Sequence, residues 1–161
     1  MHHHGYAWTG EKRVFDDEAV RRPPYPDPPP PAAPGDSAAQ RLVERYREVV
    51  AEFAVTGVPP METAYWLVKP AALVRGTWAE PKEAGVWLAE RLAEAAPRFA
   101  RGSERDPVRT ERLVRDTVER LGWGGDVSLG HFLGGTLFHS LALVTCSPNR
   151  ARPDLGCPLA R

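Results

Sequence analysis

Between Val127 and Asn149 the chain runs for 23 residues without an aspartate, glutamate, lysine or arginine. A segment this long and uncharged either crosses a membrane or lies inside a domain. Two of its side chains are imidazoles, His131 and His139, which are costly in lipid unless they face other helices. We therefore expect a helix over 127–145 that its neighbours bury on all sides. A single membrane span is the weaker alternative.

The rest of the chain shows helical rather than strand periodicity. The segments expected to form helices lie at about 38–56, 60–76, 79–96, 106–121 and 127–145, and the first, third and fourth of them have apolar residues at helical spacing. Ser37 and Gln40 form a capping box, and Asp106 followed by Pro107 is typical of a helix start. No segment alternates with a period of two. The sequence thus predicts an all-α fold, a compact bundle of about five helices over residues 37–146.

Residues 1–36 and 147–161 are expected to lie outside this bundle. Eight of the 17 prolines fall between Pro23 and Pro34, a density that favours an extended polyproline spacer. The segment before it contains Tyr6, Trp8 and Phe15. Aromatic side chains have no use in a disordered arm, so we expect them to dock on the domain or on a partner protein.

Composition narrows the function classes. The 21 basic and 21 acidic residues cancel, which argues against binding to nucleic acid or anionic lipid through bulk charge. Two cysteines do not make a disulfide framework, and no apolar signal segment is present. These observations predict a cytoplasmic protein. The excess of arginine over lysine and the lack of isoleucine are typical of a high-GC bacterium.

The uncharged segment also contains the best candidates for a site. Gly130, Gly134 and Gly135 are unfavourable inside a helix, so they make room either for another helix or for a ligand. On a helix, His131 and His139 would lie about 12 Å apart along the axis, too far to share one metal ion or haem. They are either core histidines or separate ligands or bases.

The expected second helix supplies the partners for such a site. Glu62, Tyr65, Lys69 and Arg75 lie on it or just after it. A carboxylate and an imidazole in a dry pocket shift each other's pKa and can perform acid–base chemistry. Under this hypothesis Glu62 works with His131 or His139, the remaining residues bind a ligand, and a haem or non-haem metal cofactor is an option.

A second metal hypothesis concerns the first residues of the chain. An imidazole at the third position, together with a free amine and two backbone amides, chelates Cu(II) or Ni(II), and either His3 or His4 fits this pattern. The alternative is that the histidines are chance or the remnant of an affinity tag. Cys146 and Cys157 match no standard zinc spacing.

No hydrolase, metalloprotease or nucleotide-binding motif occurs. Arg105, Arg109 and Arg112 share one helix face, which either is solvated or contacts an acidic partner. We therefore expect an interaction or accessory subunit that binds a protein partner, or a second copy, through the aromatic N-terminal arm. The alternative is a small helical enzyme or ligand-binding protein with its pocket beside Gly130 and the histidines.

Overall fold

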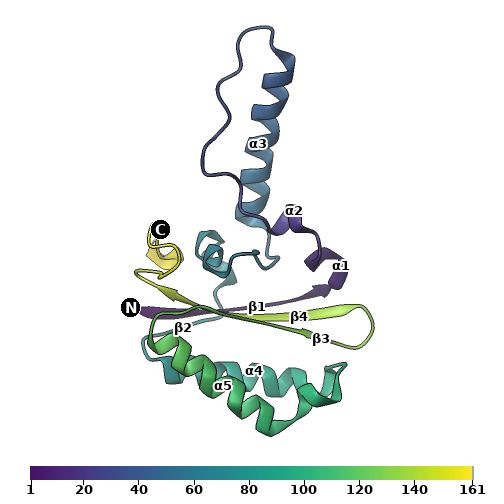
Figure 1. Cartoon of the computed structure of the whole chain (residues 1–161), viewed down its shortest axis with the longest axis vertical. Coiled ribbons are helices and arrows are strands. Elements are labelled where there is room, and N and C mark those ends of the chain that lie inside the picture. Colours follow the sequence, from purple (N-terminus) through teal and green to yellow (C-terminus); the bar gives the residue numbers. More distant parts are fainter. Residues whose placement is uncertain (161) are drawn as a thin grey trace.

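Four antiparallel strands form the centre of the molecule (Figure 1). They are β1 (His2–Glu11), β2 (Gly76–Trp78), β3 (Val127–Phe132) and β4 (Leu137–Cys146), arranged in the order β2-β1-β4-β3. The computed structural model describes residues 1–160. It is a mixed α/β fold, so the expected all-α bundle is wrong.

The uncharged segment is a hairpin and not a helix. Gly134 and Gly135 lie in the turn between β3 and β4, and Gly135 has a φ of 72°, a conformation that side chains other than glycine rarely adopt. β4 is an inner strand covered on both faces, so its residues are almost all buried and do not alternate. A continuous apolar run of this kind is equally compatible with a buried strand and with a buried helix. None of the described helices is long and apolar enough to cross a membrane.

The expected N-terminal arm is also corrected by the structure. β1 pairs with β4 over its full length, from His2 opposite Cys146 to Glu11 opposite Leu137. β2 pairs with β1 on the other side over residues 3–5. The first residues of the chain therefore lie in the interior of the sheet.

Two helices, α4 (Pro81–Ala95) and α5 (Pro107–Gly122), cover one face of the sheet and confirm two predicted helices. The Asp106 side chain accepts a hydrogen bond from the backbone N–H of Val108 at 3.0 Å, as its predicted capping role requires. The buried core between helices and sheet consists of Ala84, Leu88, Leu92, Phe99, Leu121, Val127, Leu133, Leu141 and Leu143.

The opposite face of the sheet is covered by irregular segments. The helix expected over 60–76 is replaced by two short 3₁₀ turns, Thr63–Val68 and Ala71–Leu73, separated by Pro70. The buried core on this side consists of Tyr6, Trp66, Leu67, Ala142, Val144 and Cys146. The remaining short helical segments are α1 (Lys12–Phe15), α2 (Glu18–Arg21) and the 3₁₀ turns Ala96–Arg98, Gly102–Arg105 and Pro158–Ala160.

The helix α3 (Ser37–Val55) projects away from this face (Figure 1). Its position in the sequence confirms the predicted helix over 38–56. The helix is capped by Asp36 and not by the predicted box of Ser37 and Gln40: the Asp36 side chain accepts a hydrogen bond from the backbone N–H of Ala39 at 3.0 Å. Of its residues only Phe53 is buried, so α3 contributes little to the core.

The buried Asn149 organises the tail that follows β4. Its side-chain amide donates to the Asp126 carboxylate at 2.9 and 3.0 Å and to the Thr145 carbonyl at 2.8 Å. Its side-chain oxygen accepts hydrogen bonds from the backbone N–H groups of Ala151 and Arg152. These bonds fold the tail back so that Leu155 and Cys157 pack on the sheet.

Candidate functional site

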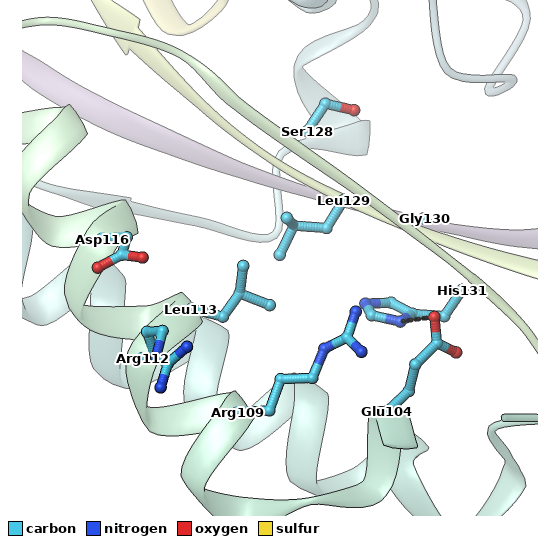
Figure 2. Close-up of a pocket in the computed structure, with 9 residues that line it drawn as sticks. All are labelled: Glu104, Arg109, Arg112, Leu113, Asp116, Ser128, Leu129, Gly130 and His131. Carbon is cyan, nitrogen blue, oxygen red and sulfur yellow. Dashed lines mark ion pairs between the residues drawn. The ribbon is translucent and has the colours of Figure 1, made fainter. Parts of the chain in front are cut away.

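The free edge of the sheet borders an open groove beside α5. β3 is an edge strand, because β4 is the one strand of residues 1–160 that pairs with it. The pocket drawn in Figure 2 has a volume of about 550 Å³, and a second pocket of about 390 Å³ shares four of its residues. The residues that line the first are Glu104, Arg109, Arg112, Leu113, Asp116, Ser128, Leu129, Gly130 and His131. We call the two pockets together the β3 groove.

The hydrogen-bond pattern shows which backbone groups of β3 face away from β4. The Leu133 N–H donates to the Leu137 carbonyl at 2.9 Å, so these two residues form a hydrogen-bonded pair. Such pairs alternate along an antiparallel ladder, so the backbone groups of Ser128 and Gly130 point outward. Phe132 follows the same rule, because its carbonyl accepts from the Ala100 N–H. The β3 groove therefore offers unpaired strand donors and acceptors at Ser128 and Gly130.

Charged side chains of both signs line the groove, and two of the arginines have no ion-pair partner. Arg109 and Arg112 lie three residues apart on one face of α5, and among the described residues neither has a carboxylate within ion-pair distance. Figure 2 shows the Arg109 side chain reaching toward the His131 ring. Arg105, which the sequence groups with them, instead donates to the Phe99 carbonyl at 2.6 and 2.9 Å. An arginine without a carboxylate partner is a ready donor to a carboxylate ligand.

At one end of the groove the carboxylate of Glu104 lies beside the imidazole of His131 without a hydrogen bond between them. Glu104 Oε1 lies 3.7 Å from His131 Nδ1, too far for a hydrogen bond. The His131 ring is 9% exposed and stacks on Phe99 with a centroid distance of 4.4 Å. Neither of its nitrogens has a hydrogen-bond partner in the described part of the chain. Burial lowers the pKa of His131, which Glu104 partly opposes, so the imidazole favours its neutral form.

The two predicted catalytic histidines are neighbours across two strands. His131 and His139 are directly opposite each other in the β3–β4 ladder, and not 12 Å apart along one helix. His139 Nδ1 is paired with the Thr9 hydroxyl at 2.7 Å. Burial lowers the pKa of His139, and the nearby His131 lowers it further.

The residues expected opposite the histidines do not line the β3 groove. Lys69 donates to the Phe53 carbonyl, and the Tyr65 hydroxyl contacts Arg152. Glu62 lines a third pocket with Trp123, which adjoins the smaller pocket of the groove at Thr63, Arg120 and Asp126. Arg75 lines another, beside Trp8 and Trp87. The carboxylate beside His131 is that of Glu104 in the 3₁₀ turn Gly102–Arg105, which was not among the predicted partners.

The three glycines have separate roles. A Cβ atom at position 130 would lie 2.5 Å from the Phe138 ring. Packing of that ring against the backbone therefore explains why the residue is glycine. Gly134 and Gly135 have open space around them and serve the turn. Only Gly130 lines the groove.

The aromatic residues assigned to a partner contact this chain itself. Tyr6 is 1% exposed and stacks on Trp66 at 4.6 Å. Phe15 packs against Phe138 at 4.4 Å and near Trp8 at 6.0 Å. A partner that reached these three side chains would have to displace contacts that already exist.

His3 and His4 lie on opposite faces of β1. His3 Nδ1 pairs with the Thr145 hydroxyl at 3.1 Å on the side of α4 and α5, whereas His4 faces the C-terminal tail. Strands flank β1 on both sides here, so the sheet holds the backbone amides that a square-planar chelate would need. Burial lowers the pKa of His4 to about 4.

Comparison with known protein families, with curated proteins and with solved structures finds no match to this chain.

Proposed function

We propose that this protein binds an extended, acidic segment of a partner protein, which adds a strand to the edge of β3 in the β3 groove. The observation that carries the proposal is the unpaired backbone of Ser128 and Gly130 beside Arg109 and Arg112. Peptides commonly bind by strand addition between an exposed edge and a neighbouring helix, where backbone hydrogen bonds give affinity and side-chain pockets give specificity. This keeps the partner expected from the sequence but assigns it to a different surface.

The charge pattern specifies the peptide. Glu104, Asp116 and Asp126 also line the groove but have partners in His131, Arg115 and Asn149, whereas Arg109 and Arg112 have no carboxylate partner among the described residues. A peptide carboxylate placed between the two arginines would gain charge-assisted hydrogen bonds. The elongated shape of the groove, formed by two pockets that share Leu113, Asp116, Ser128 and Leu129, fits an extended chain. The proposal also includes the location of the partner: we expect it in the cytoplasm, the compartment predicted from the sequence.

Selection from a random peptide display library against the full chain tests the proposal. We expect acidic peptides to be enriched, and the synthesised peptides to shift the amide resonances of β3 and α5. Arg109→Glu or Arg112→Glu should weaken binding about tenfold or more, because a hydrogen bond to a charged group contributes roughly 1.5–3 kcal/mol. Arg41→Glu makes the same charge change on α3 and should leave binding intact.

Ser128→Pro provides the matched backbone control. This substitution removes an outward N–H without removing a ladder hydrogen bond, so the fold should persist while peptide binding is lost. The proposal is wrong if no selected peptide perturbs β3, or if binding survives Ser128→Pro. A dimer of this chain that Ser128→Pro dissociates would also contradict it, because a second copy would then occupy the edge.

The pair Glu104–His131 favours a second candidate, acid–base chemistry on a ligand in the same groove. Its basis is a buried neutral imidazole whose two nitrogens have no partner, next to a carboxylate. A screen of activated carboxylic and phosphate esters would test it. Hydrolysis by the wild type that His131→Gln abolishes and His139→Gln preserves would support this candidate. Absence of turnover, or equal turnover in His131→Gln, would reject it.

A further inference from the structure

Four metal-binding side chains from the two ends of the sequence meet on the face of the sheet opposite the β3 groove. They are His2, His4, Cys146 and Cys157. Alternate residues of a strand point to the same face, which puts His2 and His4 together. Cys146 is the register partner of His2 in β4, so it points to that face as well. Cys157 arrives from the tail that Asn149 folds back.

The distances among three of these atoms, those of His2, His4 and Cys157, are close to those of a tetrahedral site, and Cys146 Sγ lies within reach of them. All four ligand atoms lie within 4.8 Å of one another. His2 Nε2 is 3.1 Å from His4 Nε2, and Cys157 Sγ is 3.5 Å from each of them. A tetrahedral zinc ion with Zn–N of about 2.05 Å and Zn–S of about 2.3 Å has edges of about 3.3 Å between nitrogens and about 3.5 Å between nitrogen and sulfur.

A second layer of contacts orients the ligands. His4 Nδ1 pairs with the Thr77 hydroxyl at 2.8 Å, which leaves Nε2 directed at the cluster. A hydrogen bond on the far nitrogen is the usual way proteins fix a metal-binding histidine. Cys146 and His4 are fully buried beside the stacked rings of Tyr6 and Trp66, and His2 and Cys157 are half-buried. The site is thus shielded on one side and accessible from the other.

We propose that His2, His4, Cys146 and Cys157 bind one Zn²⁺ ion that fastens the C-terminal tail to β1. Two thiolates and two imidazoles in tetrahedral arrangement are the ligand set that zinc prefers. Four protein ligands leave no open position, which is the pattern of a structural site rather than a catalytic one. His3 takes no part, because its side chain points to the other face of β1.

This site differs from both metal hypotheses drawn from the sequence. A terminal square-planar chelate would use His3 or His4 with backbone amides, whereas here only side chains converge. No standard spacing reveals the site, because its ligands lie at positions 2, 4, 146 and 157 and only the sheet register brings them together.

Metal analysis of the full-length chain, purified in reducing buffer without metal affinity chromatography, tests this proposal. We expect one zinc per chain by native mass spectrometry and elemental analysis. Replacement by Co²⁺ should give the intense visible bands of a tetrahedral ion together with thiolate-to-metal charge transfer. Cys157→Ser and His4→Gln should lose the ion, whereas His139→Gln, another strand histidine, should retain it.

Cys157→Ser is the most informative variant. Residue 157 lies in the tail, outside the sheet, so the fold should survive this substitution. Far-ultraviolet circular dichroism checks this, and Co²⁺ titration then measures the affinity that remains. The proposal is overturned if the wild type neither contains zinc nor binds Co²⁺ tetrahedrally, or if Cys157→Ser binds as tightly as His139→Gln. A Cys146–Cys157 disulfide in the reduced preparation, detected by thiol counting, would overturn it as well.

Discussion

Replacing Asn149 by alanine should be among the most damaging single substitutions in this protein. The two hydrogens of its side-chain amide serve the Asp126 carboxylate and the Thr145 carbonyl, and its oxygen accepts two backbone N–H groups. Asn149→Ala therefore removes one hydrogen bond to a charged group and about three neutral ones. At roughly 1.5–3 and 0.5–1.5 kcal/mol each, and with water replacing part of the loss, we expect a destabilisation of about 3–5 kcal/mol.

Urea and thermal unfolding followed by tryptophan fluorescence measure this loss. For a chain of this size each kcal/mol lowers Tm by about 2–4 °C, so the variant should melt about 6–20 °C below the wild type. Asn149→Asp is the matched substitution, since it keeps the acceptor oxygen but faces Asp126 with a second carboxylate. A loss below about 1 kcal/mol in Asn149→Ala would show that the turn after β4 does not depend on this residue.

The same variant has a defined pH dependence. Burial raises the pKa of Asp126 above its ordinary value, and the hydrogen bonds from Asn149 and Thr145 oppose this. Without Asn149 the folded-state pKa rises further, so the folded protein binds a proton that the unfolded chain releases. Stability therefore increases as pH falls through that pKa, and the gap between Asn149→Ala and wild type should narrow in acid. A gap that widens on acidification would contradict this account.

Three further outcomes follow from the structure. Gly130→Ala should destabilise by about 1–3 kcal/mol in urea unfolding, because its Cβ would lie 2.5 Å from the Phe138 ring, whereas Gly134→Ala, with open space around it, should not. Between pH 8 and 10.5 the stability of the wild type should rise relative to that of Lys69→Met, because burial lowers the pKa of Lys69 from 10.5 to about 8 and the unfolded chain then holds the extra proton. A chelator should lower Tm of the wild type and leave Tm of Cys157→Ser unchanged, if zinc fastens the tail.

Local signals in the sequence were enough to predict three helices. α3, α4 and α5 each have an amphipathic pattern, and α5 has in addition the start signal of Asp106 and Pro107; both kinds of signal depend on residues that are neighbours in the sequence. The strands were missed because their patterns depend on tertiary position. β4 is buried on both faces and shows no alternation, and β1 has imidazoles in place of the usual branched side chains.

The residues of the candidate site were likewise predicted only in part. His131 and Gly130 were identified, and both line the β3 groove, but the partner carboxylate was placed at Glu62 instead of Glu104. The reason is the strand register, which brings the loop before α5 to the end of β3 through the bond from Ala100 to Phe132. No periodicity within either segment encodes that meeting.

The pairing of β1 with β4 has a consequence for synthesis. Residue 2 lies opposite residue 146 and residue 11 opposite residue 137, so every contact in this ladder joins positions more than a hundred residues apart. During translation β1 leaves the ribosome before β4, so it has no main pairing partner until β4 has been synthesised. Long-range pairings of this kind make folding slow and leave strand edges unprotected in the meantime. The glycines of β1, Gly5 and Gly10, lower its β-propensity, and this also makes the unpaired strand less prone to aggregate.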